Sequence, residues 1–560
     1  MKPFFTTLCL VVLTAFSSFA QQAESSDEHY HIQDSIQIPT RSGIAISATM
    51  VRKLSHTEPL PVVLFYTTYH QGERDRFFGK LSADRDYVGL VVYARGIRTD
   101  LAHYAPYENE QTDIYDVIDW ISKQSWCNGA VGMYGGSYTG FSQWAAVKDS
   151  HPALKTIVPQ VAVMPGYDTP MENNVQMNLG FYWPNDNIYK KEPIRRSLPF
   201  EWFENGIAFK DLDSLAGYKS PMFQKWLSHP NYDKYWQSLV PNAEEYAKIN
   251  IPVLTTTGYY DGSQIGAIQY FKLHNKYNKK ANHYFVIGPY DHNGGQAKAA
   301  KNLMGYEIDS VANVSMRELA YDWLDHILKG KPKPELLKDK VNYQVMGTNE
   351  WRHTPDLQSL SNDKLRFYLD NATLIANKPK KKRFEVQTVD FKDRENQNNY
   401  YTPEIVFDTL DASNGLIFQS KSFENDFIVN GSFAGNLFAT INKKDMDVSL
   451  ALYELMPNGN YFFLTRYVGR ASYAKENTKR KVLQPYKKES IPFDNTRFVS
   501  KKIDRGSRLV ILLNINKHPF EIINYGSGKE PAEETMDDAG EPLLIKWHNE
   551  SYIEIPIWKE

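Results

Sequence analysis

Six short apolar runs, each about as long as one β-strand, recur between residues 61 and 289 and constrain the fold of this 560-residue chain most strongly. They cover residues 61–69, 87–94, 130–135, 156–163, 251–259 and 283–289. Continuous apolar runs, without alternation, are typical of strands in a parallel sheet that helices cover on both faces. One such helix is indicated by the i, i+3, i+4, i+7 spacing of Ile114, Val117, Ile118 and Ile121. We therefore expect a mostly parallel α/β sheet.

This pattern changes twice along the chain. Aromatic residues and short helical patterns, at 199–209 and 220–236, indicate a helical insertion. A helix at 316–328 ends at Gly330, and the Lys-Pro repeat at 331–334 predicts a stiff exit. After residue 364, short alternating strands and the hairpin signal Asn458-Gly459 predict a β-sandwich of the jelly-roll type.

One hydrophobic core rarely extends beyond about 250–300 residues, so we expect several domains. The predicted division is a signal peptide at 1–20, an α/β core in two parts at 21–164 and 249–360, a helical cap at 165–248, and a jelly roll at 361–560.

The first twenty residues have the pattern of a secretory signal. Lys2 precedes an apolar stretch at 8–16, and Ser18-Phe19-Ala20 is a small-x-small cleavage site. The stretch is too short to span a bilayer, which needs about 20 residues, and no lipid-anchor motif surrounds Cys9. Cleavage leaves Cys127 as the single cysteine, so no internal disulfide is expected. We expect an exported protein, periplasmic or secreted, without a stable membrane anchor.

Composition and motifs exclude several function classes. With 23% charged residues and a formal net charge of −2, the chain gives no reason to expect a nucleic acid or an anionic membrane as partner. No H-E-x-x-H motif and no paired Cys/His spacing is present, so neither a metal nor another cofactor is predicted. No pattern in the sequence indicates an oligomeric state.

A glycine-flanked serine connects a predicted strand to a predicted helix. The segment is Gly135-Gly136-Ser137-Tyr138-Thr139-Gly140. A nucleophilic serine on a sharp strand-to-helix turn needs small residues two before and two after it, because the two backbones approach closely. Gly135 meets the first requirement, whereas Thr139 stands where the second glycine is usual and Gly140 follows one place later.

Two residues that follow later strands can complete a catalytic triad. Asp261 follows the apolar run at 251–260, and His292 follows the run at 283–290. This is the order Ser, Asp, His of the α/β-hydrolases, and the ends of parallel strands meet at one sheet edge. Taken alone, Asp261 could simply form a turn with Gly262, and His292 could be a surface histidine. An oxyanion hole would need the Tyr138 amide and a second donor, for which Tyr69 offers its phenol.

Together with its flanking segments, this set of residues resembles the CocE/NonD hydrolases. That family contains bacterial cocaine esterase, α-amino-acid ester hydrolases, glutaryl-cephalosporanic-acid acylases and X-prolyl dipeptidyl-peptidases. The resemblance covers essentially the mature chain. The segments that carry it are Thr67-Thr68-Tyr69, Arg95-Gly96, Asp113 through Ile121, Gln124 through Gly129, Val131 through Gly140, His229-Pro230, Tyr232-Asp233, Tyr235-Trp236, Gly258 through Gly262, Ile287 through His292, Met346-Gly347, Asn349 through Arg352, and Arg470 through Tyr473.

The resemblance implies an α/β-hydrolase core, a helical cap and a carboxy-terminal jelly roll. It implies Ser137 as nucleophile, Asp261 and His292 as its partners, and Tyr69 with the Tyr138 amide as oxyanion hole. The family motif is normally G-x-S-Y-x-G, which accounts for Thr139.

One departure from the family concerns the substrate. The α-amino-acid ester hydrolases hold a substrate ammonium with a carboxylate cluster, supplied partly just after the triad aspartate. Here Gly262-Ser263-Gln264 follow, so an ammonium group would find at most Glu172 and Asp168. We therefore expect hydrolysis of a small-molecule ester or amide with a neutral or acidic acyl group.

Two other interpretations remain open at this point. The first is an X-prolyl dipeptidyl-peptidase or an α-amino-acid ester hydrolase. The second is a glycan-binding protein with a degenerate hydrolase core, suggested by aromatic residues in the last 200 positions. In the leading interpretation, aromatic residues shape the acyl pocket, and the candidates are Trp183, Trp202, Trp226, Tyr259 and Tyr260.

Overall fold

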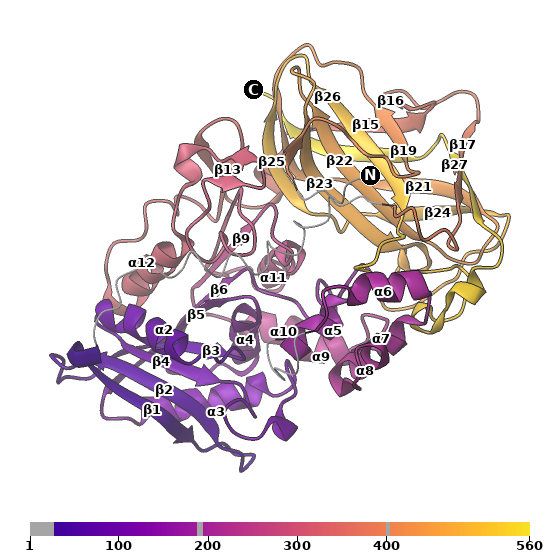
Figure 1. Cartoon of the computed structure of the whole chain (residues 1–560). Coiled ribbons are helices and arrows are strands. Elements are labelled where there is room, and N and C mark those ends of the chain that lie inside the picture. The colour runs from indigo at the N-terminus through magenta and orange to yellow at the C-terminus, as the bar shows by residue number, and fades with distance from the viewer. Residues whose placement is uncertain (1–26, 187–193, 399–403) are drawn as a thin grey trace, which may run out of the picture.

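The computed structural model describes residues 27–186, 194–398 and 404–560. The predicted signal peptide lies outside these residues. The chain forms an α/β core, a helical cap beside it, and a β-sandwich that lies against both (Figure 1).

A ten-stranded sheet forms the core, in the order β1-β2-β4-β3-β5-β6-β9-β10-β13-β14. From β4 to β13 every neighbouring pair is parallel, and antiparallel strands close both ends. The strand bounds are β1 (Tyr30–Ile38), β2 (Ile46–Lys53), β3 (Leu60–Thr67), β4 (Val88–Tyr93), β5 (Cys127–Gly136), β6 (Leu154–Gln160), β9 (Val253–Gly258), β10 (His283–Gly288), β13 (Val341–Val345) and β14 (Glu350–Thr354).

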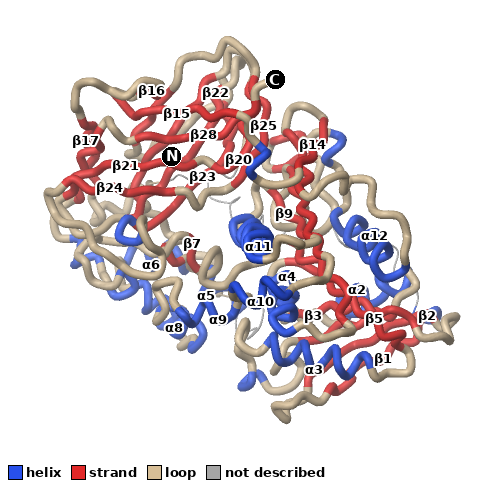
Figure 2. Tube along the Cα trace, turned by 180° about the vertical axis from the view of Figure 1, so that it is seen from behind, coloured by secondary structure: helices blue, strands red, loops and turns tan. Residues whose placement is uncertain are grey.

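Helices cover both faces of this sheet (Figure 2). Alternate strand residues belong to different hydrophobic clusters: Met133 packs with α3 and α4, and Tyr134 packs with α12. The predicted stripe of α3 is fully buried. Helix α2 lies beside α12, where the Ser82 and Tyr321 hydroxyls are 2.8 Å apart. The bounds are α2 (Glu73–Asp84), α3 (Glu110–Ser122), α4 (Tyr138–Ala146), α11 (Gln264–Tyr277) and α12 (Met316–Lys329).

Two features of the core differ from the sequence interpretation. The helix α12 ends at Gly330, which adopts a left-handed φ of 69°, but β13 and β14 then extend the sheet beyond the proline-rich exit. Strand β13 was missed because Asn342 and Gln344 interrupt its apolar pattern, although both are fully buried. Helix α2 was missed because its apolar residues form no clear stripe.

The helical insertion lies between β6 and β9. Its helices are short, and a two-stranded hairpin, β7 (Met171–Glu172) with β8 (Val175–Gln176), precedes them. The cap helices are α5 (Leu179–Pro184), α6 (Leu198–Asn205), α7 (Leu212–Leu215), α8 (Pro221–Leu227), α9 (Lys234–Leu239) and α10 (Ala243–Lys248). In the part of the chain that is described, no helix combines the length and apolar character needed to cross a membrane.

The carboxy-terminal β-sandwich is antiparallel apart from one β16–β19 contact. The predicted Asn458-Gly459 hairpin joins β22 (Asp447–Leu455) to β23 (Tyr461–Arg470), which pair antiparallel. The remaining strands are β15 (Asp363–Asp370), β16 (Thr373–Ile375), β17 (Phe384–Val389), β18 (Val406–Phe407), β19 (Leu416–Gln419), β20 (Phe427–Ser432), β21 (Ala434–Ile441), β24 (Lys488–Phe493), β25 (Phe498–Ile503), β26 (Arg508–Ile515), β27 (Leu543–His548) and β28 (Tyr552–Trp558).

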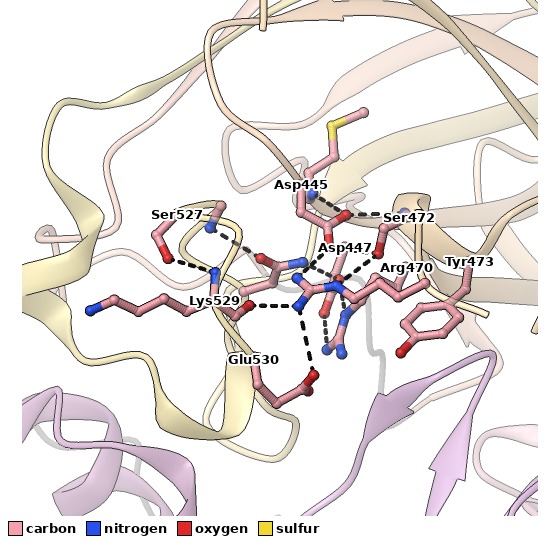
Figure 3. A network of polar contacts seen from close by, with 12 residues as sticks. Asp445, Asp447, Arg470, Ser472, Tyr473, Ser527, Lys529 and Glu530 are labelled. Carbon is pink, nitrogen blue, oxygen red and sulfur yellow. Dashed lines mark hydrogen bonds and ion pairs between the residues drawn. The ribbon is translucent and has the colours of Figure 1, made fainter. Parts of the chain in front are cut away.

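A buried polar network lies within the sandwich (Figure 3). Arg470 donates two hydrogen bonds to Asp447, at 2.8 and 3.0 Å, and both side chains are fully buried. The backbone amide of Arg470 donates to the carbonyl of Asn173 in the cap region at 3.2 Å. Beside this pair, Asp445 accepts hydrogen bonds from Ser472 and Arg480.

We predict that Arg470→Met destabilises the protein by about 3–5 kcal/mol, because it leaves Asp447 as an uncompensated buried charge. Chemical denaturation measures the change. Lys559→Met is the control: its ion pair with Asp363 is exposed, and we expect no measurable loss of stability. The prediction is wrong if both variants unfold at the same denaturant concentration.

Candidate active site

Ser137 lies on the sharp turn between β5 and α4. Its backbone has φ 63° and ψ −124°, a conformation that residues other than glycine rarely adopt. Three backbone hydrogen bonds hold it: its amide donates to the Gln160 carbonyl at 3.1 Å, and its carbonyl accepts from the Phe141 amide at 3.0 Å and from the Val163 amide at 3.5 Å. The serine is therefore fixed at the edge of the sheet where β5 ends.

Two glycines make this turn possible. A Cβ atom on Gly135, whose φ is 134°, would lie 2.3 Å from Cγ2 of Thr139. A Cβ atom on Gly140 would lie 2.8 Å from Cα of Ala162. The close approach of helix and strand thus falls at Gly140, while the Thr139 methyl group fills the space beside Gly135. This geometry explains why a threonine occurs in the motif.

Asp261 and His292 form a hydrogen-bonded pair at the same sheet edge. The Nδ1 atom of His292 lies 2.7 Å from Oδ1 of Asp261. The fully buried Asp261 carboxylate also accepts hydrogen bonds from the Thr257 hydroxyl at 2.7 Å and the Ser263 amide at 2.9 Å. Because Nδ1 faces the carboxylate, Nε2 is the ring nitrogen left for proton transfer.

The pKa values of this pair move apart. Burial alone disfavours both charged forms, but mutual attraction and hydrogen bonding outweigh it. The pKa of Asp261 is therefore lowered, and the pKa of His292 is raised above its ordinary value. A charged carboxylate that stabilises an imidazolium is what a general base of the Ser-His-Asp type requires.

Gln296 connects the histidine loop to the serine turn. Its amide nitrogen donates to the carbonyl of His292 at 2.9 Å. Its Oε1 atom lies against Gly136, where a Cβ atom would approach to 2.1 Å. One side chain thus holds the loop of His292 beside the residue that precedes Ser137.

Tyr69 and Tyr138 flank Ser137 as the sequence interpretation expected. Tyr69 follows β3, and the Ser137 side chain is near enough to lower the pKa of its phenol, though less than burial raises it. Its oxygen accepts a hydrogen bond from Trp183 Nε1 at 3.0 Å, so its own proton is available to another acceptor. Burial raises the pKa of the Tyr69 phenol, which keeps that proton in place at neutral pH. Tyr138 is the first residue of α4, where backbone amides lack acceptors within the helix.

Two residues near the site were missed from the sequence. The Tyr138 hydroxyl donates to Glu110, which also accepts the Tyr107 amide at 3.0 Å. Burial raises the pKa of Glu110 to about 7. Tyr107 stacks on Trp183 with ring centroids 5.7 Å apart. Glu110 is the first residue of α3, where an acidic residue is common at a helix start, so its position alone does not indicate a role in the site.

The predicted pocket aromatics divide into two groups. Trp183 bonds to Tyr69, and Trp226 stacks on Trp183 with centroids 6.3 Å apart, so both belong to the aromatic cluster at Ser137. The contacts of Trp202, Tyr259 and Tyr260 lie elsewhere. Trp202 packs on Phe209 within the cap, while the hydroxyls of Tyr259 and Tyr260 donate to the Gln344 and Phe463 carbonyls. These are packing contacts, and a pocket role for the three residues stays a prediction.

The two acids that were expected to be the most available to an ammonium group are already engaged. Asp168 accepts the amides of Met164 at 2.8 Å and Gly266 at 3.0 Å. Glu172 forms an ion pair with Arg497 at 2.7 Å. Within the described residues, no group of three or more His, Cys, Asp or Glu side chains could hold a metal ion.

Comparisons with known proteins identify the family and the fold. Residues 42–294 match the family model of the X-Pro dipeptidyl-peptidases (S15 family), and residues 337–494 match the C-terminal non-catalytic domain of X-Pro dipeptidyl-peptidase. Cocaine esterase of Rhodococcus sp. (strain MB1 Bresler) is 21% identical, over 91% of this chain and 95% of that protein.

Two solved structures have the same fold. An aminopeptidase from a marine sediment Thaumarchaeota archaeon superposes with a TM-score of 0.83 and 19% identity, covering 96% of this chain and 98% of that one. An α-amino acid ester hydrolase superposes with a TM-score of 0.78 and 19% identity over the whole of both chains. The predicted α/β-hydrolase core, cap and sandwich are thereby confirmed.

We predict that Asp261→Asn lowers the pKa of His292, because burial then acts without the opposing attraction of the carboxylate. NMR titration of the histidine rings measures the shift, with the His292 signal identified by its loss in His292→Gln. Asp291→Asn is the matched control: Asp291 also raises the pKa of His292, but as the smallest of the favourable contributions. Equal shifts in the two variants would contradict the assignment.

Proposed function

Since this chain is a serine hydrolase of the group formed by the CocE/NonD hydrolases and the S15 peptidases, we propose that it cleaves an ester or amide through an acyl-enzyme on Ser137. The observation that carries the proposal is the convergence of four residues after four parallel strands. Tyr69, Ser137, Asp261 and His292 follow β3, β5, β9 and β10, whose carboxyl ends meet at one edge.

In the proposed mechanism, the Ser137 hydroxyl attacks the carbonyl carbon while His292 Nε2 accepts its proton. Asp261 keeps the proton of Nδ1 in place and stabilises the imidazolium. The Tyr69 hydroxyl and the Tyr138 amide donate hydrogen bonds to the oxyanion. His292 then returns the proton to the leaving alcohol or amine, and water attacks the acyl-enzyme by the same steps in reverse order.

The proposed substrate carries an uncharged or acidic acyl group. An X-prolyl dipeptidyl-peptidase or an α-amino-acid ester hydrolase needs an acidic anchor for an amino group. Asp168 and Glu172 are bonded to other groups, and the side chain of Gln264, which lies three residues after Asp261, makes four hydrogen bonds to backbone atoms. These contacts favour a substrate without an ammonium group. The alternative of a glycan-binding protein with a decayed site finds no support, since all three triad positions are occupied.

We predict that Ser137→Ala abolishes hydrolysis of short-chain p-nitrophenyl esters and labelling by a fluorophosphonate probe, because the attacking oxygen is lost. Thermal unfolding should stay close to that of the wild type. Ser359→Ala, at an exposed serine, should leave both activities unchanged. Activity that survives in Ser137→Ala would contradict the assignment of Ser137 as the nucleophile.

Tyr69→Phe is the companion variant for the oxyanion hole. Loss of one donor typically costs about 10²–10³ in kcat. Tyr486→Phe, at a tyrosine that is 73% exposed, is the control.

The proposed site of action is outside the cytoplasm, on the strength of residues 1–20. We predict that the protein recovered from the periplasm or the medium begins at Gln21, the residue after the cleavage motif. N-terminal sequencing tests this. A mature protein that keeps Met1 and stays in the cytoplasm would contradict the export proposal.

A further inference from the structure

A buried ion pair connects the sandwich to the segment that leaves the catalytic edge of the core. Arg497, directly before β25, donates to Glu172 of β7 at 2.7 Å. The side chains are 8% and 2% exposed. Such a pair in the interior is rarely more stable than two apolar residues of similar size, so stability alone gives little reason for its presence.

The pair lies next to the proposed triad. The same Arg497 nitrogen, Nη2, donates to the carbonyl of Gly262 at 3.2 Å, and Gly262 directly follows Asp261. The next residue, Phe498, is fixed by its backbone to the Gln264 side chain at 2.7 and 2.9 Å. Arg497 is therefore held at the loop that carries the triad aspartate.

Hydrogen bonding of the pair is incomplete. Glu172 Oε1 and Arg497 Nη1 are buried and have no hydrogen-bond partner among the residues that the structure describes. Besides its single hydrogen bond, the pair balances the charge of the Glu172 carboxylate with that of the Arg497 guanidinium.

Among the three acids Asp261, Asp168 and Glu172, Glu172 is the one whose charge is balanced by Arg497. Asp261 is balanced by His292. Asp168 is fully buried and accepts the backbone amides of Met164 and Gly266, and burial raises its pKa well above the ordinary value. Removing Arg497 would leave Glu172 without its guanidinium and make the charge beside the triad more negative.

We infer that Arg497 is a specificity-determining residue: its charge cancels that of Glu172, and the site therefore prefers uncharged acyl groups over those that carry an ammonium or a carboxylate. The inference rests on the proposed function and narrows its substrate class. The residue that sets the preference for acyl groups of a given charge then belongs to the sandwich.

The test compares three p-nitrophenyl esters with acyl chains of similar length, one uncharged, one ending in a carboxylate and one ending in an ammonium. For the wild type, kcat/KM should be highest for the uncharged ester. Arg497→Gln should raise the ammonium ester relative to the uncharged one by roughly 10-fold, because Glu172 is unmasked. Glu172→Gln should raise the carboxylate ester by a similar factor, and the double variant should restore the wild-type order.

Two matched variants separate charge from structure. Arg497→Lys keeps the charge and should keep the wild-type order of the esters. Lys501→Gln removes another buried ion pair nearby in the sequence, that of Lys501 in β25 with Glu454, and should also keep this order. Thermal unfolding of each variant identifies any that do not fold, and the double variant and the wild-type ranking then still test the inference.

The outcomes are distinct. A wild type that hydrolyses none of the esters and does not react with the fluorophosphonate overturns the proposed function. A wild type that hydrolyses them but prefers a charged acyl group overturns the inference alone, as does an unchanged order in both folded single variants.

Discussion

The backbone conformation of Ser137 is the constraint on which the rest of the site depends. A residue with a side chain at φ 63° and ψ −124° carries strain of about 1–3 kcal/mol, so its surroundings must hold it there. Three neighbouring glycines allow this, because a Cβ atom on any of them would collide with a neighbour. The neighbours are Thr139 at Gly135, Gln296 at Gly136 and Ala162 at Gly140. The helix α4, the histidine loop and the end of β6 are thus all positioned against the same turn.

The buried acids of this region differ in their hydrogen-bond partners and in the direction in which their pKa is shifted. Asp261 keeps its charge because His292 and two further donors face it. Glu110 and Asp168 sit in environments where burial raises their pKa, so they favour the protonated form at higher pH than an exposed acid does. Glu172 has a guanidinium beside it. Each of these acids is therefore neutralised or engaged.

Much of the core and of the proposed site could be predicted from local patterns. The apolar runs predict the parallel strands, and the chain order of Ser137, Asp261 and His292 predicts their meeting because parallel strands end at one edge. The pocket role of Trp202, Tyr259 and Tyr260 has no such local signal, because an aromatic residue that packs in a core has the same local pattern as one that lines a pocket.

The remaining features depend on contacts between distant parts of the chain. Arg497 and Glu172 are 325 positions apart, and no pattern around either residue indicates the other. Strand β13 has two buried amide side chains, whose partners are supplied by other segments, such as Asp309 for Gln344. A strand whose buried polar side chains bind distant segments cannot be predicted from its own residues alone.

The four hydrogen bonds of the Gln264 side chain have a consequence for how such a protein evolves. Two of them reach the backbone of Phe498 in the sandwich. Backbone contacts are insensitive to side-chain identity, so the sandwich stays docked while its neighbouring side chains change. Proposed catalysis and proposed selectivity can then diverge independently, since Ser137, Asp261 and His292 belong to the core and Arg497 belongs to the sandwich.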